Sequence, residues 1–137
     1  MKPVLLDTGC IVGLLDRSER HHGACVSAAA ELHVPLVTCE PVIAEACYLL
    51  RGMPTAVDAI LANVEQKIFQ IPLQIEAQAG AVRALLKKYA RVPMDLADAC
   101  LVRLAEELGT GEILTLDSDF QIYRWARNRP FHLLVDL

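Results

Sequence analysis

Short, continuously apolar runs alternate along this 137-residue chain with longer segments whose apolar residues have helical spacing. The pattern predicts strands at residues 2–7, 34–38, 67–73, 112–117 and 131–137. It predicts helices from residue 8 to a stop at 16–18, and at 20–33, 41–51, 55–66, 75–91, 96–108 and 118–127. Strands that are apolar on both faces are typical of a parallel sheet covered by helices on both sides. We therefore expect one α/β domain spanning residues 1–137.

The composition favours a soluble protein with a large apolar interior or an apolar partner surface. Hydrophobic residues make up 54% of the chain, yet no apolar run approaches the roughly 20 residues that span a bilayer. The N-terminus lacks the charged, apolar and cleavage regions of a signal peptide. The five cysteines form no CxxC pair and lie in apolar stretches, which predicts reduced, buried thiols. We expect a cytoplasmic location, no membrane association, and a homodimer or a groove covered by a partner.

The formal charge of −4 argues against broad electrostatic capture of nucleic acid. Cations bound at four acidic residues would reduce that excess to zero. Arg124, Arg127 and Arg129 also form a local basic cluster. Net charge alone therefore excludes little.

Acidic side chains occur where predicted strands end and where predicted helices begin. Asp7 closes the first strand and Asp117 the fourth, and ligands of open α/β sheets bind beyond the carboxyl ends of strands. Asp98 lies in the first turn of the 96–108 helix. Glu45 is the only charged residue of the stretch PVIAEACYLL, residues 41–50. These four carboxylates can converge at one edge of the sheet if the first and fourth strands are neighbours.

Clustered carboxylates repel one another and raise one another's pKa unless a cation neutralises them. Magnesium and manganese prefer oxygen ligands and bind through a few carboxylates together with substrate phosphate. Such ions activate water and stabilise the charge of a phosphodiester displacement. On this interpretation Glu45 faces a cation or the water bound to it.

Each acid also has a purely structural interpretation. Asp7 can cap the helix that follows it, and Asp117 or Asp119 can cap a helix beginning near Ser118. Asp95 and Asp98 form a D-x-x-D variant of the capping box, in which Asp98 reaches back to the start of the helix. Glu45 can pair with Arg51 or Arg103.

Four segments together resemble the PIN-domain ribonucleases, and above all the VapC-type toxins of prokaryotic toxin–antitoxin pairs. They are LLDTG, PVIAEACYLL, MDLADACLVRLAEELG and ILTLDSDF, and the resemblance runs from Val4 to about Leu134. It implies an α/β/α sandwich with a parallel five-stranded sheet and Mg²⁺- or Mn²⁺-dependent cleavage of RNA. It also implies an antitoxin partner.

The same resemblance implies roles for particular residues. It makes Asp7, Asp98 and Asp117 ligands of one or two divalent ions, with Glu45 as a further ligand or as the base for the attacking water. It makes Thr8 and Thr115 hydroxyl supports of the carboxylates and Asp119 an accessory acid. Gly9 departs from the family pattern, since many relatives have Ser there, and relatives often have Ser at the position of Asp95.

RNA contacts are less defined by the sequence. Arg124 is a candidate for binding an RNA phosphate, and a solvated helix face is its structural alternative. Tyr48 and Trp125 are interpreted as packing residues rather than base-stacking platforms.

Three other functions deserve comparison with the ribonuclease hypothesis. LLDTG also matches aspartic proteases, but those are β-rich, and this chain is rich in helical patterns. A receiver domain would need an adjacent acidic pair after the first strand and a lysine ending the last, where this chain has Thr8 and Asp136. A PIN-like module without nuclease activity remains the main alternative, although all four acids are present.

Overall fold

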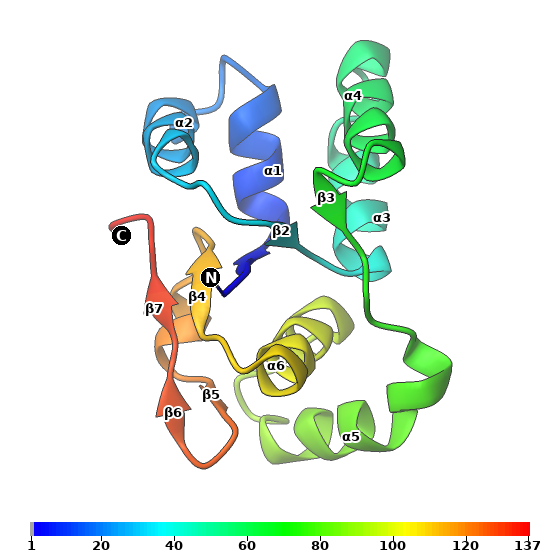
Figure 1. The fold of residues 1–137 in the computed structure, drawn as a ribbon, viewed down its shortest axis with the longest axis vertical. Helices are drawn as coiled ribbons and strands as arrows, with labels where there is room; N and C mark the ends of the chain where they lie inside the picture. The colour runs from blue at the N-terminus through cyan, green and yellow to red at the C-terminus, as the bar shows by residue number, and fades with distance from the viewer. Residues whose placement is uncertain (1) are drawn as a thin grey trace.

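Five short parallel strands form the centre of the molecule in the computed structural model, which describes residues 2–137 (Figure 1). They are β1 (Val4–Leu6), β2 (Leu36–Val37), β3 (Phe69–Gln70), β4 (Glu112–Leu114) and β7 (His132–Leu133). The strand order is β3-β2-β1-β4-β7, so β1 is central and pairs with β2 on one side and β4 on the other. The predicted parallel five-stranded sheet is confirmed, and the first and fourth strands are neighbours.

Within residues 2–137, six α-helices surround the sheet and complete the three-layer α/β/α arrangement. They are α1 (Thr8–Leu15), α2 (His22–Ala30), α3 (Glu40–Leu49), α4 (Pro54–Glu65), α5 (Ile75–Lys88) and α6 (Leu96–Leu108). Helices α1 and α2 pack together on one side of the sheet, and α5 and α6 pack together on the other (Figure 1). Helix α4 contacts the edge strand β3. None of the described helices has the length and apolar character needed to cross a membrane.

The helix α6 is the most deeply embedded of the six. Eight of its residues, from Ala97 to Ala105, are buried, and burying one large aliphatic side chain contributes about 1.5–3 kcal/mol. Its ends are fixed as well, because the Asp95 side chain caps the N-terminus and Gly109 ends the helix with a left-handed φ of 66°. The bounds equal those predicted from sequence, and any side chain carried by α6 is held on a rigid support.

The predicted helix at 118–127 is wrong beyond residue 121. A 3₁₀ helix, η1 (Ser118–Gln121), is followed by β5 (Arg124–Trp125), which pairs antiparallel with β6 (Arg129–Pro130). Ala126 and Asn128 have positive φ angles of 49° and 64°, which no α-helix permits. The buried Trp125 ring stabilises this hairpin by donating from Nε1 to the Pro130 carbonyl.

All five predicted strands are shorter than expected. Pro35 precedes β2 and Pro72 follows β3, and proline cannot donate a hydrogen bond to a neighbouring strand. The predicted strand at 131–137 is reduced to His132–Leu133 because its neighbour β4 ends at Leu114. All five cysteines are free thiols, as the sequence predicted, and four of them are buried; Cys47 is partly exposed, which differs from the prediction.

Candidate active site

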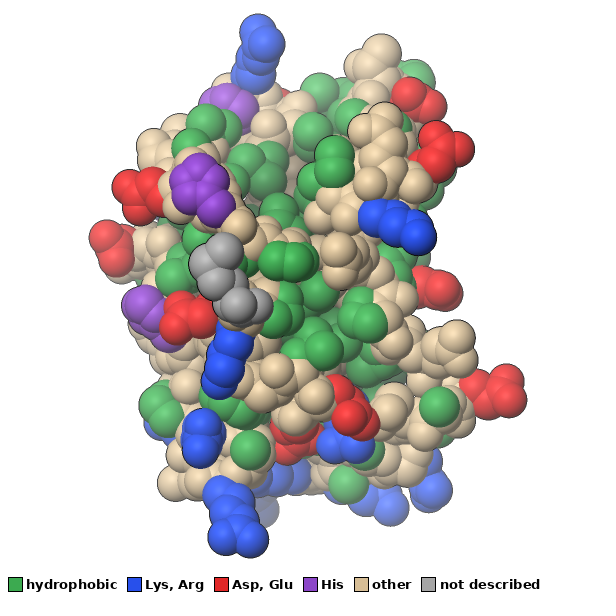
Figure 2. Space-filling model, viewed as in Figure 1, with side chains coloured by type: hydrophobic (Ala, Val, Ile, Leu, Met, Phe, Trp, Pro, Cys, Tyr) green, Lys and Arg blue, Asp and Glu red, His purple; other side chains and the backbone are tan. Residues whose placement is uncertain are grey.

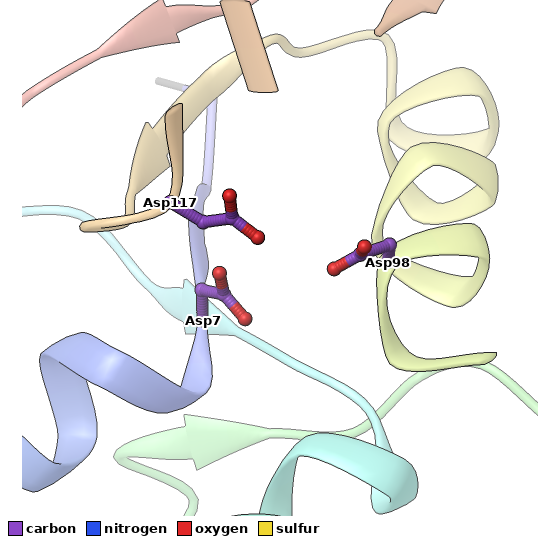
Figure 3. A group of neighbouring side chains, drawn as sticks. All are labelled: Asp7, Asp98 and Asp117. Carbon is purple, nitrogen blue, oxygen red and sulfur yellow. The ribbon is translucent and has the colours of Figure 1, made fainter. Parts of the chain in front are cut away.

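Three aspartates from distant parts of the chain face one another at the carboxyl edge of the sheet (Figure 3). Asp7 directly follows β1, Asp117 follows β4, and Asp98 lies in the first turn of α6. One carboxylate oxygen of each lies within 4.8 Å of the corresponding oxygens of the other two. The β1–β4 pairing brings Asp7 and Asp117 together, and α6 presents Asp98 from the opposite side of the gap (Figure 3).

Both oxygens of Asp7 accept hydrogen bonds. The Thr8 backbone N–H donates to Oδ1 at 2.8 Å, and the Thr115 hydroxyl donates to Oδ2 at 2.7 Å. The side chain is only 7% exposed, and this burial raises the pKa of Asp7 to about 6. The two hydrogen bonds oppose the rise, and the charges of Asp117 and Glu45 add to it.

Asp98 is equally buried, at 7% exposure, and its Oδ2 accepts a 2.8 Å hydrogen bond from the Tyr123 hydroxyl. Burial raises the pKa of Asp98 to about 7, against the Tyr123 hydrogen bond and with help from the charges of Asp95, Asp7 and Asp117. Asp95 is the helix cap, because its Oδ1 accepts from the Asp98 N–H at 2.8 Å. The capping-box prediction for the Asp98 side chain is therefore wrong, since that carboxylate bonds Tyr123 instead.

Asp117 is partly buried and caps η1. Its Oδ1 accepts from the Asp119 N–H at 2.9 Å, and its own N–H donates to the Thr115 hydroxyl at 3.0 Å. Thr115 therefore contacts both Asp7 and Asp117. Asp7 and Asp117 can therefore cap a helix and also belong to the acidic cluster, because one carboxylate has enough lone pairs to accept a backbone N–H and to bind a cation.

A cleft of about 340 Å³ opens over the three aspartates. It is lined by Asp7, Thr8, Gly9, Val12, Glu19, Glu45, Leu49, Asp95, Ala97, Asp98, Leu116 and Asp117. Six of these residues are acidic, and none is Lys, Arg or His. The described part of the chain thus places no basic side chain on the walls of this cleft.

Glu45 is exposed, although nearly all its neighbours in the sequence are apolar. Its apolar neighbours Val42 and Ala46 lie on the buried face of α3, followed by the buried C-cap Leu50, and Glu45 lies on the face toward the cleft. Within residues 2–137 it has no ion-pair partner: Arg103 pairs with Glu106 and Glu107. Arg51 instead donates to the Tyr48 carbonyl and lies 4.0 Å from the centre of the Tyr48 ring.

The remaining predicted residues have varied surroundings. The Thr8 hydroxyl is the one buried side-chain polar atom of the described residues that lacks a hydrogen-bond partner. Asp119 is outside the cleft lining. The Arg124 Nη1 atom donates to the carbonyls of Gln121, Ile122 and Tyr123, so its guanidinium stabilises the end of η1.

Of the two aromatic residues expected to be packing residues, one is buried and one is not. Trp125 is buried, as predicted. Tyr48 is 62% exposed, and its prediction is wrong. Because Tyr48 is three residues after Glu45, it lies on the same outward side of α3 rather than in the core.

Two residues near the cluster were not predicted from the sequence. Glu19 lines the cleft from the turn after α1, but the surrounding DRSER segment has the composition of an ordinary surface loop. Tyr123 contacts Asp98 across 25 residues, and no local pattern reports such a contact. The only local sign of a role for Tyr123 was its position a few residues after Asp117, the aspartate that follows a strand.

The donor set fits a hard divalent cation. The cluster offers carboxylate oxygens only, which suits Mg²⁺ or Mn²⁺ better than metals that favour Cys or His. Burial is the main cause of the raised pKa values of Asp7 and Asp98, and the neighbouring carboxylates raise both further, so the charged form of the cluster is disfavoured without a cation. A bound dication would compensate this charge.

The central parallel sheet with three aspartates at its carboxyl edge defines an α/β protein whose acidic cleft is suited to metal ions and phosphate chemistry. The family model of the PIN domain matches residues 4–126, and the chain belongs to the PIN domain family. No curated protein matches the chain in sequence. The fold is similar to the crystal structure of VapC20 from Mycobacterium tuberculosis, a sarcin–ricin loop cleaving toxin. The TM-score is 0.77 at 18% identity, over 93% of this chain and 99% of that chain.

Proposed function

We propose that this protein is a Mg²⁺- or Mn²⁺-dependent endoribonuclease and the toxin of a toxin–antitoxin pair. The observation that carries the proposal is the convergence of three carboxylates in a cleft without basic residues, on a PIN domain. The structurally similar VapC20 is an RNA-cleaving toxin. We further propose that residues 1–137 act as one domain, of which residue 1 lies outside the described structure.

In this proposal Asp7, Asp98 and Asp117 hold the metal, which when bound polarises the scissile phosphate and lowers the pKa of water. The chain's own residues orient the reacting groups and accept or donate protons. Glu45, exposed on the α3 wall, accepts a proton from the attacking water as that water adds to phosphorus and the P–O bond breaks. Thr115 holds the Asp7 carboxylate, and the unpartnered Thr8 hydroxyl is free to donate toward an incoming ligand.

The RNA backbone needs positive charge that the cleft does not offer. Figure 2 shows Lys and Arg side chains gathered at the lower end of the molecule, where Figure 1 places α5 and the β5–β6 hairpin. The exposed basic residues of α5, of the turn after it and of the hairpin are Arg83, Lys87, Lys88, Arg91, Arg127 and Arg129. We assign RNA phosphate contacts to this end of the molecule. Arg124 would join these contacts through the guanidinium N–H groups that do not donate to backbone carbonyls.

The partners and location follow from the same proposal. Exposed apolar side chains on α3 and α4, namely Tyr48, Leu49 and Leu61, support a covered surface in a homodimer or under an antitoxin. A toxin of this kind acts in the cytoplasm. Size-exclusion chromatography with light scattering tests the homodimer, and a small reading frame immediately upstream would support an antitoxin.

The decisive experiment maps RNA fragments after incubation with purified protein, with and without a chelator. We expect chelator-sensitive cleavage by the parent, and none by Asp7→Asn or Asp117→Asn, whose thermal stability should not be lower than that of the parent. Variants that cut as well as the parent would refute the site assignment. Calorimetry with Mn²⁺ separates the alternative of a non-catalytic PIN-like module, because such a module binds no ion.

A further inference from the structure

Tyr123 is fully buried, with 0% exposure, and its only hydrogen-bonding side-chain atom points at the acidic cluster. The hydroxyl donates to Asp98 Oδ2 at 2.8 Å. Tyrosine hydroxyls in protein interiors usually find a partner, but here the partner is one of the three converging carboxylates. The bond is therefore more than a way of satisfying a buried phenol.

The Tyr123 ring has no freedom to turn away. Its centroid lies 5.1 Å from that of Tyr89 and 5.0 Å from that of Phe120, both in edge-to-face geometry. Phe120 in turn packs edge-to-face on Phe131. The Tyr123 backbone N–H donates to the Asp119 carbonyl, and the next backbone N–H, that of Arg124, donates to the Tyr89 hydroxyl.

The segment that holds Tyr123 also carries Asp117. Residues 117–123 contain Asp117, η1 and Tyr123. One short segment therefore supplies one aspartate of the cluster and donates a hydrogen bond to another, Asp98. Asp98 faces Asp7 and Asp117 from a separate element, α6 (Figure 3). With Oδ2 occupied by Tyr123, the rotation of the Asp98 carboxylate is fixed relative to Asp117.

We propose that Tyr123 is a positioning residue that fixes the Asp98 carboxylate in the orientation that lets it share a divalent cation with Asp7 and Asp117. The inference rests on the proposed metal-dependent function and adds a residue to it. Partners that orient metal ligands typically contribute 10–100-fold to metal affinity or activity. Tyr123 contacts the ligand and not the metal or the RNA, so its effect must appear first in metal binding.

The test compares Tyr123→Phe, which keeps the ring and removes the hydroxyl, with Tyr89→Phe. The control removes a second buried hydroxyl from the same aromatic cluster, one that accepts from a backbone N–H and touches no carboxylate. Titration calorimetry with Mn²⁺ on the chelator-stripped proteins, without RNA, measures the dissociation constant. We expect about 10–100-fold weaker binding for Tyr123→Phe and a change within about twofold for Tyr89→Phe.

A kinetic measurement separates positioning from general loosening of the fold. The Mn²⁺ concentration for half-maximal cleavage should rise in Tyr123→Phe, while kcat at saturating Mn²⁺ and KM for RNA stay close to those of the parent. A crystal structure of the parent with Mn²⁺ bound gives a check that needs no variant. The Tyr123 hydroxyl must still contact Asp98 there, and its release would overturn the proposal.

The outcomes also distinguish this inference from the proposed function. A parent that binds Mn²⁺ and a Tyr123→Phe variant with an unchanged dissociation constant would overturn the role of Tyr123 alone. Mn²⁺ binding without RNA cleavage would refute the ribonuclease function and leave the positioning role intact. A parent that binds no Mn²⁺ would overturn both.

Discussion

The Thr115 hydroxyl donates a 2.7 Å hydrogen bond to Asp7 Oδ2 and so joins residues 108 positions apart in the sequence. The register of β1 and β4, in which Leu6 pairs with Leu114, brings the next residue of each strand to the same edge. The same hydroxyl accepts from the Asp117 N–H. One threonine therefore sets the relative positions of two cluster aspartates.

Thr115→Val should weaken Mn²⁺ binding by about 10–100-fold. The hydroxyl bond is the largest of the effects that lower the pKa of Asp7, so its loss lets burial raise that pKa further above 6. Cleavage should then fall more at pH 6 than at pH 8. Thr38→Val is the matched control, because its buried hydroxyl donates to the Leu6 carbonyl and not to an acid. It should cost about 1 kcal/mol of stability without changing the pH profile.

The metal-free protein should be less stable at pH 8 than at pH 5. Folding raises the pKa of Asp7 from 3.8 to about 6 and that of Asp98 from 3.8 to about 7, so the folded state binds protons more tightly than the unfolded state. The free energy of unfolding therefore falls as the pH rises from 5 to 8, by on the order of 1–1.5 kcal/mol for Asp7 alone. Thermal unfolding in chelator measures it.

Adding Mg²⁺ at pH 8 should reverse this loss, because a ligand that binds only the folded state stabilises it. The same addition at pH 5 should do much less, since protons compete with the metal for the carboxylates. A melting temperature in chelator that is as high at pH 8 as at pH 5 would contradict the raised pKa values.

Glu45→Gln should lower kcat by about 10²–10⁴-fold, the usual contribution of a general base. Glu45 is exposed and lies outside the group of oxygens within 4.8 Å, so Mn²⁺ affinity and melting temperature should be unchanged. Glu40→Gln is the control, since Glu40 is an exposed acid of the same helix that does not line the cleft. A large loss of Mn²⁺ affinity in Glu45→Gln would make Glu45 a ligand instead.

Asp95→Ala should destabilise the protein by about 1 kcal/mol, because it removes the N-cap of α6. Asp95→Ser keeps a capping oxygen and should retain most of the stability. Both variants should cleave RNA below their melting temperatures, since Asp95 is assigned a structural role. Abolished cleavage in a folded Asp95→Ser protein would place Asp95 in the catalytic machinery.

Gly9→Ser should be tolerated and slightly stabilising, by about 0.5 kcal/mol, because serine is the better helix former. A Cβ at Gly9 would lie 3.5 Å from Leu116 Cβ, an ordinary contact. In Gly13→Ser, by contrast, the new Cβ would lie 2.7 Å from the buried Cys25 Sγ. Chemical denaturation should show a loss of about 1–3 kcal/mol there. Equal stability of the two variants would contradict the packing described for α1.

The parts of the site that follow from local pattern were predictable. Asp7 and Asp117 end buried strands, and the strand-end rule alone places them at one edge of the sheet. The 96–108 helix has an Asp cap, an apolar face and a closing glycine, so both its bounds and the place of Asp98 were predicted. The sequence alone did not give the β1–β4 pairing, which is a contact between distant segments.

The parts that depend on three-dimensional neighbours were not predictable. Glu45 stands among apolar residues in the sequence, yet the helix turns those residues to the core and Glu45 outward. The β5–β6 hairpin depends on positive φ angles at Ala126 and Asn128, and although Asn commonly adopts this conformation, Ala rarely does. The contact of Tyr123 with Asp98 needs the packing of the aromatic cluster, and no spacing rule encodes it.

The central place of β1 in the sheet has a consequence for synthesis. Asp7 leaves a translating ribosome more than a hundred residues before β4 and Asp117 emerge. Until then the nascent chain holds Asp7 without the neighbour that positions it. Translation products that stop before residue 117 would therefore be inert, whatever else of the fold they had formed.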